Sequence, residues 1–182
     1  MRVSKISNVS RLRHPYTRRL LSNLIGRDPN RVFASTPAEL RRLVRELTRN
    51  ELIRRPARGK WPIAWIVHHL ADTEVGFAFR IRLAMAESGA PFQPFDQDRW
   101  ARGLGYNRRS VASSIATFTA LRRSHVELLT LSTRGELGRF GVHEERGREN
   151  IERMIHMLAG HDINHLRRIR AIRGRLGRKN PA

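Results

Sequence analysis

The sequence has no cysteine, few lysines and no long apolar run. Without cysteine the chain can form no disulfide, has no cysteine nucleophile and cannot bind zinc or an iron–sulfur cluster through thiolate, so any metal must be bound by His, Asp or Glu. No apolar segment approaches the roughly 18 to 20 residues that span a bilayer. The basic N-terminus lacks the apolar core and the cleavage site of a secretory signal. We therefore expect a cytoplasmic protein without a membrane partner.

Acidic residues are also scarce relative to basic ones. Lys and Arg together number 36, of which three are Lys, against 16 Asp and Glu, which gives a net charge of +20. Such a charge attracts nucleic acid or an anionic surface. The alternative is a set of solvated basic helix faces, which we prefer because no aromatic-and-basic recognition motif accompanies the charge. Residues 1–27 hold seven basic residues and no acidic one. This arm is either disordered or a short basic helix around Tyr16 to Ile25, and it could bind nucleic acid.

The 182 residues, 40% of them apolar, are enough for one folded domain with a sizeable core. Four stretches show helical periodicity and none shows a strand pattern. The first helix is expected to begin at Thr36, with Pro37 in its first turn and Glu39 completing a capping box. We predict an all-α four-helix bundle with long loops between the helices. The predicted helices cover residues 36–55, 61–87, 110–131 and 148–173, and the long loops cover 89–107 and 133–147.

The chain is divided accordingly into three parts. Residues 1–27 form the basic arm, residues 28–174 form the bundle domain, and residues 175–182 form a basic C-terminal tail.

Three histidines share the apolar faces of two predicted helices. His161 and His165 are four residues apart, which places them on one side of a helix, and that side is the apolar one. His69 is in phase with the apolar residues of its own predicted helix and therefore lies on the apolar face. A buried imidazole costs free energy unless its ring nitrogens find partners, and a divalent metal supplies one shared partner for three neutral imidazoles. Three His ligands with one open position are typical of a catalytic zinc site, and nickel or iron would also accept imidazole.

Other residues near these histidines are secondary candidates. Asp72 lies three residues after His69 and is a candidate hydrogen-bond partner of a ligand, or an additional ligand. His143 lies in the glycine-rich loop and could reach the open side of the site. His68 is expected to be exposed or at a helix interface rather than a ligand. The alternative to a metal site is a set of core histidines that are each satisfied separately, because an isolated H-x-x-x-H pattern is a weak signal.

Two motifs resemble those of the DinB-like superfamily, which includes bacillithiol transferases of the YfiT type. The first is KWP at residues 60–62 followed by HHLADTE at 68–74, and the second is GHDINHL at 160–166. The resemblance extends over residues 28–174. It implies a four-helix bundle, often dimeric, with a divalent metal bound by His69, His161 and His165.

The resemblance also implies an activity on a small molecule. Characterised members transfer low-molecular-weight thiols such as bacillithiol and mycothiol, or isomerise a substrate with a thiol cofactor. We expect a metal-dependent enzyme whose ion, with zinc preferred, activates either the thiol of a cosubstrate, as an S-transferase does, or water, as a hydrolase does. Two alternatives stay open: a nucleic-acid-associated bundle that uses its basic arm, and a bundle in which the metal only stabilises the fold.

Overall fold

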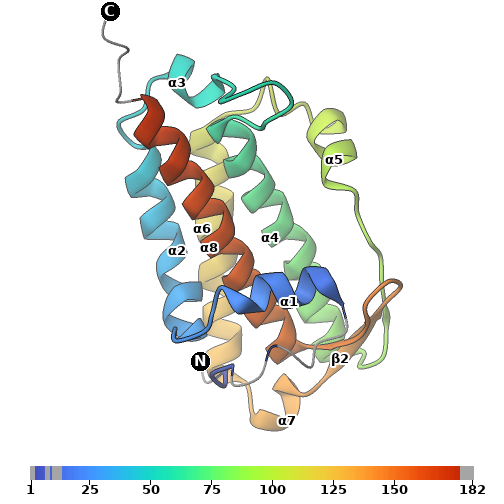
Figure 1. Ribbon diagram of the computed structural model, residues 1–182. Coiled ribbons are helices and arrows are strands. Elements are labelled where there is room, and N and C mark those ends of the chain that lie inside the picture. Colours follow the sequence, from blue (N-terminus) through green and yellow to red (C-terminus); the bar gives the residue numbers. More distant parts are fainter. Residues whose placement is uncertain (1–2, 7–8, 10–13, 177–182) are drawn as a thin grey trace, which may run out of the picture.

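The computed structural model describes residues 3–6, 9 and 14–176, and a bundle of four long helices forms its main body (Figure 1). Helices α2 and α4 each pack against both α6 and α8, so α2 and α4 stand at opposite corners of the bundle. The predicted four-helix bundle is therefore confirmed. From residue 177 onward the predicted C-terminal tail lies outside the described residues. The four helices are α2 (Pro29–Val44), α4 (Ile63–Ala86), α6 (Val111–Leu131) and α8 (Ile151–Leu176).

Shorter helices flank the bundle. Helix α1 (Pro15–Ser22) crosses α8, as Figure 1 shows. Helix α3 (Arg49–Ile53) precedes α4, whereas α5 (Gln97–Gly103) and α7 (Arg134–Leu137) lie within the two connections that were expected to be loops. None of the helices in the described residues combines the length and the apolar character that a transmembrane span requires.

A small sheet ties the two long connections together. Strand β1 (Pro91–Phe92) pairs in parallel with β2 (Phe140–His143), which pairs antiparallel with β3 (Gly147–Asn150). The ring of Phe92 lies over Gly141, where a Cβ atom would collide with it. The expectation of a chain without strands is therefore wrong. Strands of two to four residues are too short to show a period of two in the sequence.

The first bundle helix begins at Pro29 and not after Thr36, which corrects the predicted start. Asp28 caps this helix, because its Oδ1 accepts a hydrogen bond from the Asn30 backbone N–H at 2.9 Å. Pro37 therefore lies inside the helix, where it has no N–H to donate to the carbonyl of Phe33. Arg122 of α6 donates to that carbonyl at 2.7 Å. The hydrogen bond that proline removes is thus replaced by one from another helix.

A buried group of charged side chains joins all four bundle helices. Arg122 is 1% exposed. Its Nε and Nη2 donate to the two carboxylate oxygens of Glu74 at 2.8 and 2.7 Å, and its Nη1 donates to Asp162 Oδ2 at 2.7 Å. The rings of Phe33 and Phe118 cover the guanidinium, with centroids 3.9 and 4.6 Å from Cζ. The charged residues therefore connect α4, α6 and α8. The hydrogen bond from Arg122 to the carbonyl of Phe33 connects α2 to the same group.

Electrostatics within this group keep Glu74 ionised. Burial alone would raise the pKa of Glu74, but the charge and hydrogen bonds of Arg122, together with His125, lower it to about 2. His125 Nδ1 lies 2.7 Å from a Glu74 oxygen. Burial raises the pKa of Asp162 to about 6, against the lowering effect of Arg122. We refer to Arg122, Glu74, Asp162 and His125 as the Arg122 network.

Helix α1 packs across α8 at Gly160. The backbone of Leu20 approaches so closely that a Cβ atom on Gly160 would collide with the Leu20 carbonyl. Asn23 Nδ2 donates to the Gly160 carbonyl at 3.0 Å, and the buried side chains of Leu20 and Leu21 pack with Met157 of α8. The helical alternative for this part of the basic arm is therefore confirmed.

We expect Arg122→Met to destabilise the fold by about 3–5 kcal/mol, because it leaves two carboxyl groups buried without their cation. Urea unfolding at pH 7 measures the change in the free energy of unfolding. Arg123→Met removes the same charge from an exposed neighbouring position and should change that free energy by less than about 0.5 kcal/mol. Equal stability of the two variants would contradict the structural role of the network.

Gly160→Ala should displace α1 from α8 while the bundle stays folded, because the added Cβ meets backbone and not a flexible side chain. Hydrogen exchange followed by mass spectrometry should show faster exchange over residues 15–22 and unchanged exchange in α4. Gly174→Ala is the matched control, since the Cβ position of this other α8 glycine has no neighbouring atom within 4 Å. Unchanged exchange over residues 15–22 in Gly160→Ala would contradict the prediction.

Candidate metal centre

The three histidines predicted as ligands lie together between α4 and α8. His69 Nε2 and His161 Nε2 are 3.0 Å apart. One ring nitrogen from each of His69, His161 and His165 belongs to a group whose members all lie within 4.8 Å of one another. The side chains are buried, with 4 to 6% exposure. The register of the two motifs therefore placed the three imidazoles in one cluster, which we call the His cluster.

The surroundings keep these imidazoles neutral. Burial lowers the pKa of His69 to about 4 and lowers the pKa values of His161 and His165 well below their ordinary value. For His161 and His165, the neighbouring cluster histidines lower the pKa further, as does the positive charge of Arg168. Neutral imidazole is the form that binds metal ions. The cluster is thus in the ligand-competent protonation state at neutral pH.

The chemistry of this donor set fits a divalent cation. With metal–nitrogen bonds of about 2.0–2.1 Å, two ligand nitrogens of a tetrahedral site lie about 3.3 Å apart, and the His69–His161 separation of 3.0 Å is close to this value. Within the described part of the chain, the buried Nδ1 atoms of His161 and His165 have no hydrogen-bond partner. The Nε2 atoms of His69 and His161 face each other, and a hydrogen bond between them uses the lone pair of only one ring, whereas a shared cation accepts a lone pair from each.

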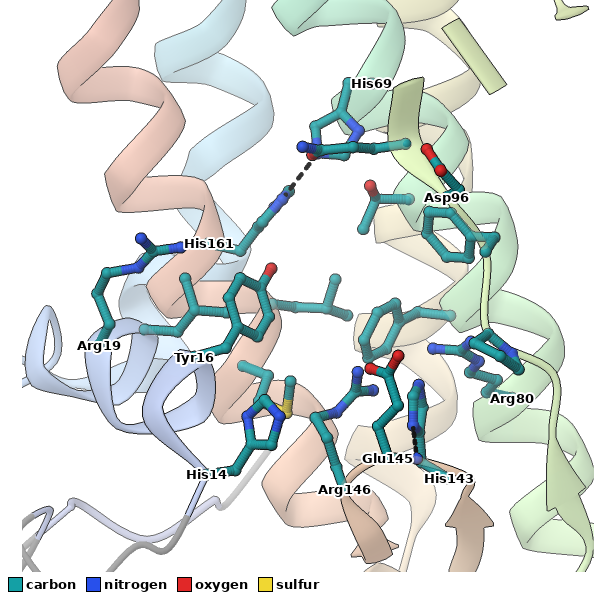
Figure 2. A pocket seen from close by; sticks show the side chains of 18 residues that line it. His14, Tyr16, Arg19, His69, Arg80, Asp96, His143, Glu145, Arg146 and His161 are labelled. Carbon is teal, nitrogen blue, oxygen red and sulfur yellow. Dashed lines mark hydrogen bonds between the residues drawn. The ribbon is translucent and has the colours of Figure 1, made fainter. Parts of the chain in front are cut away.

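The His cluster forms part of the wall of a pocket of about 620 Å³ (Figure 2). His69 and His161 line this pocket, and Thr73, Phe77 and Arg80 continue its wall along α4. Other parts of the wall come from α1 through Tyr16 and Arg19, from the segment after β1 through Phe95 and Asp96, and from the end of β2 and the turn after it through His143 and Arg146. In Figure 2 the hydroxyl of Tyr16 points to the side on which His161 lies. The cluster is therefore accessible to a small molecule from the pocket.

The secondary candidates lie outside the His cluster. Asp72 accepts a hydrogen bond from Arg109 Nη1 at 2.6 Å. The negative charge of Asp72 raises the pKa of His69, but burial lowers that pKa by more. His143 lines the same pocket as the cluster, and its Nδ1 accepts from the Glu145 backbone N–H at 3.2 Å. The roles proposed for Asp72 and His143 beside a metal stay predictions.

His68 lies at a helix interface, which is one of the two positions that we expected for it. It is fully buried, and its Nδ1 lies 2.8 Å from Ser114 Oγ of α6. Its side chain therefore contacts α6, and it is not a member of the His cluster.

Sequence reasoning missed several pocket residues. Arg80 follows His69 by eleven residues, about three helical turns, so the periodicity that placed His69 inward also predicts an inward Arg80. Tyr16 and Arg19 come from the basic arm, where no pattern indicates packing against α8. Arg146 comes from a turn whose position depends on the small sheet. Only Arg80 carried a signal that could have been found in the sequence.

We expect the metal-free chain to lose stability as the pH falls from 6.5 toward 4. In this window the unfolded chain binds a proton at His69, whose ordinary pKa is 6.5, while the folded chain, with a pKa of about 4, does not. Protonation therefore favours unfolding. His69→Gln removes the titrating ring and should reduce the loss between pH 7 and pH 4.5 by about 2 kcal/mol.

Urea unfolding of both proteins at the two pH values measures this difference. The pH 7 data serve as the reference, because His69 is neutral there in the folded state and mostly neutral in the unfolded state. An identical pH dependence of the two proteins would contradict a buried, neutral His69.

Comparison with known proteins finds relatives over most of the chain, and the names of these relatives refer to metal-dependent hydrolysis. A protein of Bacillus mycoides (strain KBAB4), named a "putative metal-dependent hydrolase", is 28% identical over 140 residues, which cover 77% of this chain and 80% of that protein. A protein of the same description from Oceanobacillus iheyensis is 26% identical over 152 residues, which cover 84% of this chain and 88% of that protein.

A solved structure with the same fold is that of YfiT from Bacillus subtilis, described as a probable metal-dependent hydrolase with an unusual four-helix bundle topology. The two structures superpose with a TM-score of 0.77 at 23% sequence identity, over 82% of this chain and 86% of YfiT. The family model of the DinB superfamily matches residues 33–169, which include the whole His cluster. The resemblance seen in the two histidine motifs is thereby confirmed, and the chain belongs to the DinB superfamily.

Proposed function

We propose that this chain is a metal-dependent hydrolase of a small molecule, with a divalent ion bound by His69, His161 and His165. The observation that carries the proposal is a cluster of three buried, neutral imidazoles at the wall of a pocket of about 620 Å³. A pocket of this size suits a small organic substrate. Similarity to proteins named as metal-dependent hydrolases supports water, rather than a thiol, as the co-reactant.

When bound, a divalent ion in a site of three imidazoles supplies Lewis acidity, on which metal-dependent hydrolysis depends. We prefer zinc because three histidines with an open position are typical of its catalytic sites, and nickel or iron are the alternatives. The protein contributes orientation and partial exclusion of water. The ring of Trp61 packs edge-on against His69, with centroids 5.3 Å apart, and holds the orientation of that imidazole.

Tyr16 is placed to bind the substrate at the cluster end of the pocket. Partial burial raises the pKa of its phenol, with smaller opposing effects from Arg146 and Arg19, so the hydroxyl keeps its proton at neutral pH. Because this hydroxyl points toward the side of His161 (Figure 2), it can donate a hydrogen bond to a substrate oxygen next to the cluster. That role assigns a function to α1, which lies outside the segment matched by the family model.

A transfer reaction with an external thiol uses the same machinery. The chain has no cysteine, so the sulfur nucleophile would enter with a cosubstrate, and the ion would lower the pKa of that thiol as it does for water. The two reactions are distinguished by measuring turnover with and without an added thiol such as bacillithiol.

We expect the untagged protein to bind about one equivalent of divalent metal, and His69→Ala, His161→Ala and His165→Ala each to lose it. Elemental analysis by mass spectrometry measures the metal content. His156→Ala is the matched control. His156 lies on the same helix, but its Nε2 contacts the Ser4 carbonyl at 2.7 Å, away from the cluster. Full metal content in the cluster variants, or none in the wild type after reconstitution, would refute the assignment.

Activity is tested on a panel of small esters and amides with the same proteins. Hydrolysis should require the metal, stop on chelation and be lost in His161→Ala while His156→Ala retains it. Metal binding without turnover of any substrate, combined with a large fall in melting temperature on chelation, would instead support a structural metal.

A further inference from the structure

Arg80 is a buried cation without an ionic partner. Its side chain is 5% exposed, and no carboxylate within the described residues forms an ion pair with it. Two other arginines with little exposure behave differently. Arg122 and Arg146 each contact a carboxylate at 2.6 to 2.7 Å. A buried charge is costly unless it is paired, so the isolation of Arg80 requires an explanation.

The guanidinium of Arg80 is held in one orientation but only partly hydrogen-bonded. Its Cζ lies 5.4, 5.7 and 5.5 Å from the ring centroids of Phe77, Phe92 and Phe95. Its Nη2 donates to the backbone carbonyl of Gln93. Aromatic faces attract a cation but do not neutralise it, and a guanidinium has five N–H donors. Donors therefore remain for a group that enters the pocket.

Arg80 and the His cluster belong to one wall of one pocket. His69, Thr73, Phe77 and Arg80 all line it from α4, and Figure 2 shows His69 and Arg80 at different ends of this wall. Eleven residues of helix separate the two Cα atoms by about 16 Å along the axis. A single ligand that reaches both ends must be elongated.

The acidic residues of the pocket do not compensate this charge. Asp96 accepts hydrogen bonds from two backbone N–H groups at the start of α5, at 2.8 and 3.0 Å. Glu145 is exposed to solvent. Arg146, which also lines the pocket, is paired with Glu149 at 2.6 Å. Burial lowers the pKa of Arg80 most, the charge of Arg146 lowers it further, and the charge of Glu149 raises it by a smaller amount. Both lowering effects would be relieved by an incoming anion.

We propose that Arg80 is the anion-recognition residue of this pocket and that the substrate is an elongated organic anion. Its carboxylate or phosphate contacts the Arg80 guanidinium, while its reacting group lies at the His cluster. The assignment of the reacting end rests on the proposed hydrolase function, whereas the anion site stands on the burial and isolation of Arg80.

Binding is tested with isothermal titration calorimetry on the full-length, metal-containing chain. Hexanoate and hexyl phosphate are the carboxylate and phosphate probes, and hexanamide is the neutral probe of the same length. The wild type should bind at least one anion about tenfold more tightly than hexanamide, and Arg80→Met should remove that difference. The two anions distinguish a carboxylate substrate from a phosphate one. Binding of neither anion by the wild type overturns the proposal.

Two further variants serve as controls for the site of binding. Arg82→Met removes the same charge from an exposed position on the same helix, where Arg82 contacts Ser124 at 2.8 Å, and should leave the affinity unchanged. His161→Ala tests whether the anion binds at the His cluster and not at Arg80. Loss of affinity in His161→Ala but not in Arg80→Met overturns the proposal. If Arg80→Met does not fold, Arg80→Lys replaces it, and undiminished affinity there overturns the proposal, because lysine lacks the planar donor fork.

Turnover links the anion site to the reaction. Hydrolysis of monomethyl sebacate adds water across the ester C–O bond and releases sebacate and methanol, and dimethyl sebacate presents the same ester without the charge. The wild type should prefer the half-ester about tenfold in kcat/KM, and Arg80→Met should lose this preference mainly through KM. Equal turnover of both esters by the wild type would overturn the proposal. Anion binding that depends on Arg80 without turnover of either ester would refute the hydrolase function but leave the anion site supported.

Discussion

The guanidinium of Arg122 fixes the four bundle helices relative to one another. It contacts a carbonyl of α2, Glu74 of α4 and Asp162 of α8 at 2.7 to 2.8 Å, and it lies on α6 itself. Charges buried to this extent are tolerated only if nearly all their hydrogen bonds are made with good geometry. A shift of one helix by a single residue would break several of these bonds at once. The network therefore selects one register of the bundle from the many that apolar packing alone would accept.

The His cluster depends on this register. Asp162 is the residue next to His161, and Glu74 follows His69 by five residues. Arg122 forms ion pairs with both carboxylates and so joins α4 to α8. These ion pairs therefore also set the distance between His69 and the two histidines of α8. Metal ligands must be held to within about half an ångström to bind well. The Arg122 network is thus the support of the cluster, although none of its atoms faces the pocket.

The sequence was sufficient for the parts of the structure that repeat with the helical period. Helices α4, α6 and α8 and the meeting of His69 with His161 and His165 follow from that period. The start of α2 was misplaced because Thr36, Pro37 and Glu39 form a good capping signal, whereas a tertiary hydrogen bond from Arg122 replaces the one that Pro37 removes inside the helix. The small sheet and the docking of α1 at Gly160 depend on contacts between distant segments, which no local pattern encodes.

The pocket combines two positive centres with different chemical characters. The neutral imidazoles of the His cluster become a cationic centre only when they hold a metal ion, whereas Arg80 carries its charge permanently at the other end of the same α4 face. Arg80 has no carboxylate partner within the described residues, and a neutral substrate would leave its charge uncompensated. An elongated anion with its charged end at Arg80 compensates this charge, and its neutral reacting end extends toward the His cluster. The electrostatics of the pocket thus favour the same substrate class that the isolation of Arg80 indicates.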